Sequence, residues 1–476
     1  MTDPGPFPTM WVMEPTLKDA IPAIETTWVI VAAVLVMFMQ VGFLFLEVGF
    51  SRMKNAGTIV PKILANFSIA AICYWAVGFA LAFGGAGWFA GTEGTFLGTS
   101  DPSLFPAMEF SQAVVPAKFF FQFVFCAVSL AIVWGTTIER IKFGAYLIYA
   151  VVFSALIYPI ISHWIFGGGW LQATSGMQDF AGSTVVHLTG ATGAFAALLL
   201  LGPRQGKYGE DGKPNAIPGH SMPLVGLAVL VLWFGWFGFN AGSTLGAIGG
   251  RFAEVVVVTQ LGAAAGVLGA MLVSYQVTRK FDMGMTANGA IAALVAITAP
   301  SGYVEFWAAP LIGFVAGVIV VGAIVLIDRK LDDPVGALSA HGIAGVWGTL
   351  ACGLFTSPRL AELNAIGDGG LFYTGSFHQL GIQALGVGAA FTSVFAVSYI
   401  VFFAIKKVYG LRVEEHEERY GLDIVEHGMW GYPEAFMPVP GSEYRPPAMP
   451  TGWPPRQPAP VTHARMAAHA APVQEG

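Results

Sequence analysis

Two stretches decide the fold: STVVHLTGATGAFAALLLL at residues 183–201 and LSAHGIAGVWGTLACGLFT at residues 338–356. Neither stretch contains Asp, Glu, Lys or Arg, and each carries one histidine, His187 and His341. Each is long enough to cross about 30 Å of hydrocarbon as an α-helix. Because lipid offers no partner for backbone N–H and C=O groups, an apolar stretch of this length predicts a transmembrane helix.

The whole chain has the composition of an integral membrane protein. Of its 476 residues, 55% are hydrophobic and 11% are charged, whereas an average soluble domain has about 25% charged residues. A soluble protein of this size could not cover its surface with so few charges. The net charge of −6 argues against a nucleic-acid partner. Three cysteines without a CxxC pair predict neither a disulfide framework nor a metal site.

Nine further apolar runs accompany these two, which predicts an all-α integral membrane protein with eleven transmembrane helices. The run that ends at Pro300 is the shortest. The apolar residues are continuous rather than alternating, which argues against a transmembrane β-barrel. The predicted spans are 28–50, 59–83, 117–138, 142–166, 183–201, 221–240, 254–275, 287–300, 304–327, 338–356 and 380–405.

Lysine and arginine residues alternate between the two sets of connections. One set, which includes the loops after residues 50, 138 and 201, carries 14 of them, and the opposite set carries 4. Loops rich in these residues stay in the cytoplasm. The pattern therefore predicts an N-terminus outside the cell membrane and a C-terminus inside, which an odd number of spans also requires.

The predicted helices divide the chain into four segments. Residues 1–27 form an extracellular N-terminal segment that lacks the features of a signal peptide. Residues 28–405 form the eleven-helix domain, and residues 406–434 form a charged cytoplasmic C-terminal segment with short predicted helices. Residues 435–476 are rich in proline and are predicted to be disordered.

His187 and His341 lie in the fifth and tenth predicted helices, where a polar side chain is costly. One interpretation is structural, with each imidazole hydrogen-bonded to a neighbouring helix. The other starts from their spacing. Two inverted five-helix repeats followed by a final helix would bring both imidazoles together near the midplane. A pair of neutral imidazoles could conduct a small neutral polar molecule and oppose a bare cation.

Aromatic side chains cluster at one end of the third and sixth predicted helices. Core packing or an aromatic belt at the membrane interface explains such clusters. The alternative is a vestibule that binds a cation on aromatic faces beside a hydroxyl group. Asp179, just before the fifth helix, is predicted to cap its N-terminus and thereby to favour cations nearby. The clusters are Phe119, Phe120, Phe121, Phe123 and Phe125, and Trp233, Trp236, Phe237 and Phe239 before Ser243.

Seven motifs together resemble the ammonium transporter (Amt/Rh) family, and its microbial and plant Amt branch more closely than its Rhesus branch. The resemblance covers about residues 25–430. The motifs are FLEVGFSRMKN at 45–55, ERIKF at 139–143, GGGWL at 167–171, DFAGSTVVH at 179–187, WFGFNAGS at 236–243, DDPVGALSAHG at 332–342 and GLDIVEHG at 421–428.

The resemblance implies the ammonium transporter fold, a homotrimer with one pore in each subunit, and roles for particular residues. His187 and His341 match the twin pore histidines of the family. Phe125, in FQFVF at 121–125, and Phe239 match the paired phenylalanines of the outer gate. Ser243 matches the hydroxyl that receives the substrate. Asp179 matches the aspartate below that site, and Trp236 lies near the pore.

Two positions depart from the family pattern. Phe166 stands before GGG where these proteins commonly have tryptophan, which removes the strongest cation–π surface and an indole donor. Trp164 lies nearby, but its offset of two residues points it to a different helix face. Gly336 replaces a carboxylate in the loop before His341. Transport remains the expectation, with weaker recruitment of the substrate.

The sequence therefore predicts a transporter that recruits ammonium or methylammonium at an aromatic vestibule, deprotonates it and conducts ammonia past the two histidines. No cofactor is expected, and the spans contain none of the nucleophile, HExxH or acidic-dyad patterns of an enzyme. A Rhesus-like channel for neutral gas is one alternative. A sensor that signals through a partner is the other, and the resemblance implies a PII-type protein at Arg412, Gly421, Asp423, His427 and Gly428 on the cytoplasmic face.

Overall fold

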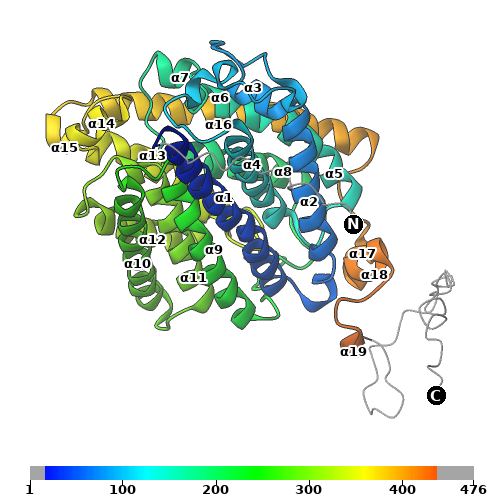
Figure 1. Ribbon diagram of the computed structural model, residues 1–476. Helices are drawn as coiled ribbons and strands as arrows, with labels where there is room; N and C mark the ends of the chain where they lie inside the picture. Colours follow the sequence, from blue (N-terminus) through cyan, green and yellow to red (C-terminus); the bar gives the residue numbers. More distant parts are fainter. Residues whose placement is uncertain (1–16, 437–476) are drawn as a thin grey trace, which may run out of the picture.

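The computed structural model describes residues 17–436, and all the secondary-structure elements in this range are helices (Figure 1). Residues 1–16 of the predicted extracellular segment 1–27 and residues 437–476 of the predicted disordered tail 435–476 lie outside the described residues. The α-helices are α1 (Leu17–Phe50), α2 (Ile59–Cys73), α3 (Phe79–Phe83), α4 (Val115–Thr137), α5 (Phe143–Val152), α6 (Tyr158–Ile165), α7 (Trp170–Ala173), α8 (Thr189–Leu201), α9 (Met222–Gly242), α10 (Arg251–Thr278), α11 (Met283–Thr298), α12 (Ala308–Ile327), α13 (Ala344–Phe355), α14 (Pro358–Asn364), α15 (Leu371–Thr374), α16 (His378–Val408), α17 (Glu415–Tyr420), α18 (Leu422–His427) and α19 (Pro433–Phe436).

Ten helical segments within residues 17–436 are long and apolar enough to cross a membrane, and α11 is a shorter apolar helix. The eleven predicted spans all correspond to helices, and the run predicted to be shortest is α11. Four spans contain π-helical turns, at Tyr74–Gly78, Phe153–Ile157, Ser183–Leu188 and Leu338–Ile343. These turns add a residue to the helix without ending it, and such turns are frequent at functional sites.

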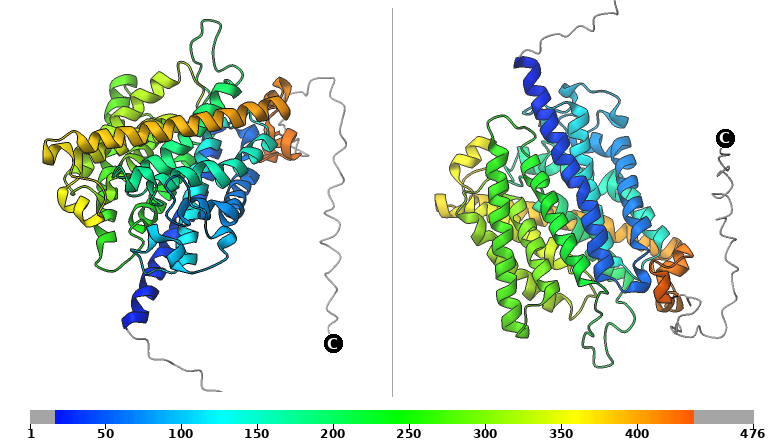
Figure 2. Two further views of the ribbon diagram at one scale, coloured as in Figure 1. Left: turned by 90° about the horizontal axis from the view of Figure 1, so that it is seen from above. Right: turned by 60° about the horizontal axis from the view of Figure 1, so that its bottom comes forward.

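The first helix is longer than predicted, because α1 begins at Leu17 rather than at residue 28. Hydropathy marks only the apolar part of a helix, whereas residues such as Asp19 extend it beyond the apolar layer. Figure 2 shows this polar end of α1 projecting from the helical bundle. The predicted boundary therefore marks where the helix becomes apolar, not where it starts.

The helices form one bundle in which segments distant in the sequence pack together. α1 packs along α9, and α10 packs against both α11 and α12. The long helix α16 crosses the bundle obliquely and contacts α8 and α13, one from each half of the chain (Figure 2). The two predicted histidine helices, which continue as α8 and α13, therefore lie at the centre.

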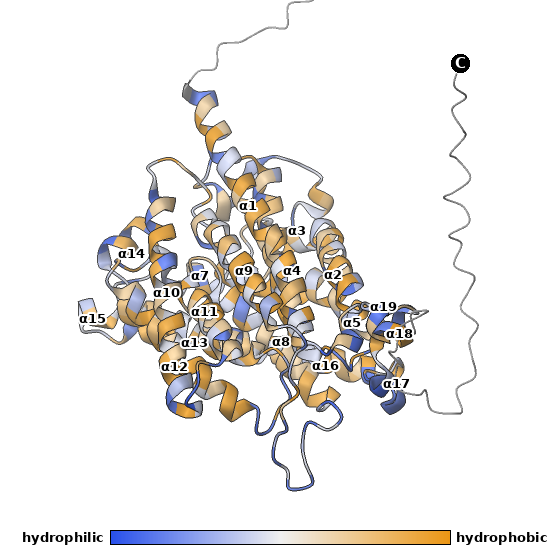
Figure 3. Ribbon diagram, turned by 90° about the horizontal axis from the view of Figure 1, so that it is seen from below, coloured by the Kyte–Doolittle hydropathy of each residue, from blue (hydrophilic) through white to orange (hydrophobic). Residues whose placement is uncertain are grey.

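Apolar side chains cover the flanks of the bundle, as expected of a surface that faces lipid. Leu230, Leu268 and Ile400 are each more than 60% exposed. Figure 3 shows the apolar flanks, whereas the connections and the short helices α17 and α18 are hydrophilic. The end of the bundle that carries the Lys- and Arg-rich loops and α17–α19 is called the basic end below.

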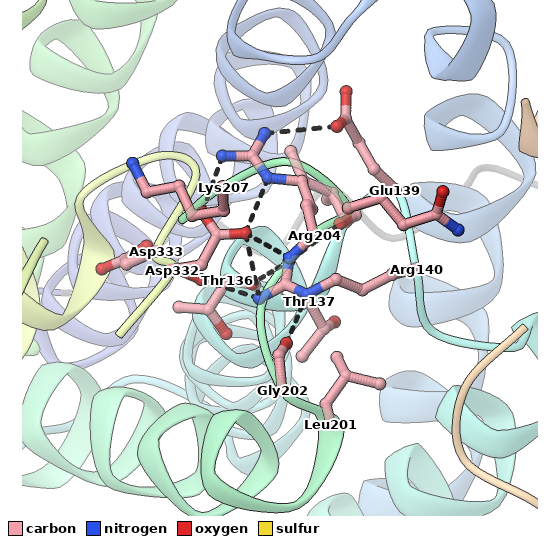
Figure 4. Close-up of polar contacts among 12 residues, drawn as sticks. Thr136, Thr137, Glu139, Arg140, Leu201, Gly202, Arg204, Lys207, Asp332 and Asp333 are labelled. Atoms are coloured by element: carbon pink, nitrogen blue, oxygen red, sulfur yellow. Dashed lines mark hydrogen bonds and ion pairs between the residues drawn. The ribbon is translucent and has the colours of Figure 1, made fainter. Parts of the chain in front are cut away.

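Four charged side chains at the basic end form a buried ion cluster, called here the arginine cluster: Glu139, Arg140, Arg204 and Asp332. Arg204 donates from Nε and Nη2 to the two carboxylate oxygens of Asp332, each at 2.8 Å, and from Nη1 to Glu139 at 3.2 Å. Arg140 donates to the carbonyl oxygens of Asp332 and Gly202. Figure 4 shows Arg204 between the two carboxylates.

The arginine cluster holds its carboxylates in the charged form. Burial alone raises the pKa of Asp332, but hydrogen bonds from Arg204 and the charges of Arg140 and Arg204 outweigh burial and lower that pKa below its ordinary value. Burial likewise raises the pKa of Glu139, but the charges of Arg204 and Arg52 and the hydrogen bonds from Arg52 outweigh burial. The pKa of Glu139 is therefore lowered. The cluster therefore joins three loops at the basic end through fully paired charges.

Candidate functional site

The two histidines meet at the centre of the bundle. The Nδ1 atoms of His187 and His341 are 3.2 Å apart, and their rings are stacked with centroids 5.2 Å apart. Both residues are buried. Because neutral imidazole has one donor and one acceptor nitrogen, one ring donates to the other across this contact. The expected approach of the two imidazoles, termed the histidine pair below, is present.

Each histidine lies in a π-helical turn whose N-terminal backbone N–H groups are capped by an aspartate. Asp179 accepts hydrogen bonds from the backbone N–H groups of Gly182, Ser183, Thr184 and Val185, at 2.8 to 3.1 Å. This is the helix cap that the sequence predicts, and it joins the start of the fifth span to a buried carboxylate. His187 follows within the same turn, Ser183–Leu188, so the cap fixes the position of its ring.

Asp333 has the same place in the second half of the chain. Its carboxylate accepts from the backbone N–H groups of Gly336 and Leu338, at 3.1 and 2.7 Å. His341 follows eight residues after Asp333, as His187 follows Asp179. Gly182 and Gly336 each stand three residues after the aspartate, with φ of 117° and 76°, a region that favours glycine. Gly336 is therefore required by the turn in which it lies.

An aromatic wall covers the histidine pair on the side away from the basic end. The rings of Phe125 and Phe239 are stacked with centroids 4.0 Å apart, and Phe239 lies 5.4 Å from the His187 ring. The ring of Trp236 is also stacked with that of His187, with centroids 5.3 Å apart. The Nε1 atom of Trp236 donates a hydrogen bond to the Thr298 hydroxyl at 2.9 Å. Phe125, Phe239 and Trp236 are all buried. Aromatic rings therefore separate the histidine pair from this end of the bundle.

Ser243 and Phe166 lie outside this buried wall. Ser243 is half-buried at the end of α9, and its hydroxyl donates to the carbonyl oxygen of Phe239, which leaves the oxygen lone pairs able to accept. Phe166 is also half-buried and packs against the core. Among residues 17–436, no ring contact joins Phe166 to Phe125 or Phe239. Trp164 instead donates from its indole to the carbonyl oxygen of Phe89.

On the opposite side, the histidine pair opens toward a small cavity. His341 lines this cavity together with Phe43, Glu47 and Asn288. The Nε2 atom of His187 is buried and makes no hydrogen bond. The pair can therefore share one proton between its Nδ1 atoms and still offer ring nitrogen to a small solute. No group of three His, Cys, Asp or Glu side chains in the described range is placed to hold a metal ion.

The predicted partner residues lie at the basic end, where part of the set holds the C-terminal segment on the bundle. Arg412 pairs with Glu418 at 2.6 Å. The buried carboxylate of Asp423 accepts from the backbone of Gly57 and Thr58. Gly421 has φ of 111° and packs against Lys54, and Gly428 has φ of 70°. His427 contacts the ring of Phe143.

Sequence reasoning missed three residues that shape the site: Asp333, Thr298 and Trp28. The signal for Asp333 was a repeated pattern, Asp-x-x-Gly-x-x-x-x-His, at 179–187 and at 333–341. Trp28 lies beside Thr244, the residue that follows Ser243, and its indole nitrogen donates to the Thr244 hydroxyl at 3.4 Å. No sequence pattern marks Thr298, which is found only from its contact with Trp236.

Comparison with known proteins shows the family to which the chain belongs. The model of the Ammonium Transporter Family matches residues 27–432. The ammonium transporter Amt2 of Archaeoglobus fulgidus is 44% identical over 424 residues, which cover 86% of this chain and 88% of that protein. The ammonium transporter of Bacillus subtilis is 32% identical, with 86% and 99% covered.

Solved structures show the same fold. A structure described as a sensor Amt protein has a TM-score of 0.79 and 37% identity, and the match covers 86% of this chain and 100% of that chain. The crystal structure of Candida albicans Mep2 has a TM-score of 0.77 and 29% identity, with 88% and 92% covered.

Proposed function

This chain belongs to the ammonium transporter family, and on that premise we propose that it recruits ammonium at the aromatic end of the bundle, deprotonates it and conducts ammonia past His187 and His341. Membership and the multi-pass helical bundle support ammonium transport across a membrane. The route through the histidine pair is a proposal that rests on its geometry. We also propose that the membrane is the cell membrane, with the basic end in the cytoplasm, and that the chain forms a homotrimer.

Recruitment must distinguish ammonium or methylammonium from potassium, which has a similar radius. Ammonium carries hydrogen-bond donors, which potassium lacks. The Ser243 oxygen accepts one of them, and the π faces of Phe125 and Phe239 attract the cation. Asp179 lies at the start of the helix that carries His187, and its carboxylate adds a negative field on the side of recruitment. Trp236 orders the ring of His187, and Phe166 contributes a weaker aromatic face than tryptophan would.

Deprotonation follows because the path beyond the phenylalanine rings is unsuited to a charged ion. The walls are aromatic and aliphatic, and an unpaired charge in such surroundings costs several kcal/mol or more. Ammonia is neutral, has both donors and a lone pair, and can exchange hydrogen bonds with the imidazole nitrogens. Potassium has no proton to give up and remains outside.

The observation that carries this proposal is the 3.2 Å contact between the two Nδ1 atoms, buried between stacked aromatic rings and the cavity beyond His341. A pair of histidines used only to join helices would not need to lie on a line that connects an aromatic gate to a cavity. The contact is therefore better explained by conduction than by helix packing alone.

Ammonium-evoked current in proteoliposomes at controlled pH, with potassium as competitor, tests the proposal. We expect a current that depends on voltage and persists when potassium is in excess. Ammonia-driven alkalinisation without current would instead favour a Rhesus-like gas channel, and Phe166 is the feature that favours this alternative. Neither current nor alkalinisation above that of protein-free liposomes would contradict transport.

A sensor is the second candidate function, because a structure with 37% identity is described as a sensor Amt protein. We propose a PII-type protein that docks at the basic end near Arg412, Gly421, Asp423, His427 and Gly428. Co-purification from nitrogen-replete cells tests this docking, and an Arg412→Ala chain that co-purifies equally well would contradict it.

A further inference from the structure

Four buried polar atoms at and around Glu47 lack a hydrogen bond of full geometry, and the Trp134 indole and the Glu47 carboxylate face each other without meeting it. They are both carboxylate oxygens of Glu47, Nζ of Lys62 and Nε1 of Trp134. Glu47 and Lys62 are fully buried. An unsatisfied buried polar group costs free energy, and an unsatisfied charge costs more. The Nζ atom of Lys62 lies over the Trp134 ring, so the two carboxylate oxygens of Glu47 are the atoms that packing leaves unexplained.

Glu47 lies at the cavity that His341 opens into. Both residues line that cavity, together with Phe43 one helical turn before Glu47 and Asn288 from α11. The ring of Phe43 lies 6.3 Å from the ring of His341. Because α1 ends at the basic end, Glu47 stands between the histidine pair and that end. A solute that passes His341 therefore meets the carboxyl group of Glu47 next.

The surroundings of Glu47 come from three helices. On α4, a Cβ at Gly135 would lie 3.4 Å from its Oε1 atom, so the carboxyl group rests against a glycine. On α2, the charge of Lys62 attracts Glu47, while the Nζ atom lies 3.2 Å from the centroid of the Trp134 ring. Tyr146 on α5 is the other titratable group that the charge of Glu47 affects.

The contrast with the arginine cluster argues against a structural ion pair. There, every carboxylate accepts hydrogen bonds from arginine. Glu47 and Lys62 attract each other without a hydrogen bond between them, and Glu426 and Asp423 also attract Lys62. A carboxyl group that is balanced in charge but unoccupied in hydrogen bonding is suited to accept and release a proton.

We propose that Glu47 is the proton-exchange group at the basic end of the pathway, where ammonia that has passed His341 regains a proton, with Lys62 as the positioning residue that balances its charge. The proposal rests on the proposed function. An N–H bond of the His341 imidazolium breaks as an O–H bond forms on the Glu47 carboxylate. That O–H bond then breaks as ammonia forms its fourth N–H bond.

The step is balanced in atoms and charge. The proton is the one removed from ammonium at the aromatic end and passed through the histidine pair. After the transfer, ammonium leaves toward the basic end, Glu47 is again a carboxylate and His341 is again neutral. One ammonium ion enters the cycle and one leaves it, so the cycle carries one positive charge across the bundle.

The test compares current with ammonia flux in proteoliposomes that contain Glu47→Gln, Glu47→Asp or the wild-type chain. Ammonia flux is read as uptake of labelled methylammonium, which counts the amine whether or not its proton crosses with it. We expect Glu47→Gln to lose at least about tenfold in current, as general acid–base groups contribute that much or more, while ammonia flux stays close to wild type. Glu47→Asp keeps a carboxyl group and should retain most of the current. Asp211→Asn, on an exposed loop, controls for reconstitution.

The double variant Glu47→Gln/Lys62→Gln removes both charges together, so that no unpaired Lys62 charge remains to destabilise the fold. It should show the same loss of current with retained ammonia flux. Three results would overturn the proposal: unchanged current in both glutamine variants, a parallel loss of current and ammonia flux, or ammonia flux without current in the wild type. The first two leave ammonium transport itself intact. Ammonia flux without current in the wild type would instead favour a Rhesus-like gas channel, and no flux of any kind in the wild type would contradict the proposed function.

Discussion

The arginine cluster and the histidine pair are both buried polar groups, but they differ in how fully they are satisfied. In the arginine cluster, both carboxylates accept hydrogen bonds from guanidinium groups. In the histidine pair, the rings touch through one nitrogen each and the Nε2 atom of His187 has no partner. Satisfied charges fix loops in place, whereas free ring nitrogens remain available to a passing solute. Burial of a polar group therefore does not by itself indicate its role.

The largest effect is expected from breaking the arginine cluster. Asp332→Asn leaves the buried guanidinium groups of Arg140 and Arg204 without their main counter-charge. We expect a loss of about 3–5 kcal/mol in the free energy of unfolding, measured by denaturant unfolding in detergent. Asp328→Asn is the matched control, because Asp328 pairs with Lys207 while its side chain is 37% exposed, and such pairs contribute about 1 kcal/mol or less. Equal losses of stability in the two variants would contradict the distinction between the buried arginine cluster and a partly exposed ion pair.

The next effect concerns the helix that carries His187. Asp179→Ala removes the acceptor of four backbone N–H groups, and we expect a loss of about 2 kcal/mol in stability together with reduced methylammonium uptake. Asp333→Ala removes the acceptor of two such groups, so its loss should be smaller. A larger loss of stability in Asp333→Ala than in Asp179→Ala would show that the number of capped backbone N–H groups does not determine the size of the loss.

Acidification should weaken the arginine cluster before it affects uncharged parts of the bundle. The pKa values of Glu139 and Asp332 are lowered in the folded protein. Their stabilisation is therefore complete above the ordinary carboxyl pKa of about 4 and is lost as pH falls through the lower folded values. Unfolding midpoints from pH 7 to pH 3 should fall at the acid end. Asp332→Asn should show a smaller fall than the wild type, and an identical fall would contradict this assignment.

The smallest effect is expected at Phe166, where a tryptophan would offer a stronger π face. Phe166→Trp should tighten the apparent affinity for methylammonium by about two- to fivefold, the equivalent of a modest cation–π contact. Phe372→Trp, at an exposed position on α15, is the control. Equal apparent affinities in the wild type and Phe166→Trp would show that this position takes no part in recruitment.

Apolar runs predicted the helices well because continuous hydrophobicity is a property of each segment alone. The meeting of His187 and His341 was also predictable, since five helices separate them and an inverted repeat brings such positions together. The polar start of α1 was not, because hydropathy does not report helix that lies beyond the apolar layer.

The contacts around the histidine pair depend on the fold and were harder to predict. Glu47 and Lys62 stand inside predicted spans, and a charged residue in a span is a signal in its own right. The place of Glu47 at the cavity, and of Lys62 behind it over Trp134, however, follows only from the packing of α1, α2 and α4. The replacement of the family's carboxylate by Gly336 is likewise explained only by the structure, because its φ of 76° favours glycine.

The most direct test of the account is methylammonium uptake by proteoliposomes that contain His187→Ala or His341→Ala, with potassium uptake measured in parallel. The account predicts that each variant either loses methylammonium uptake or gains potassium uptake, because the buried imidazoles conduct ammonia and the apolar path excludes ions. Undiminished methylammonium uptake with unaltered selectivity in both variants would contradict it.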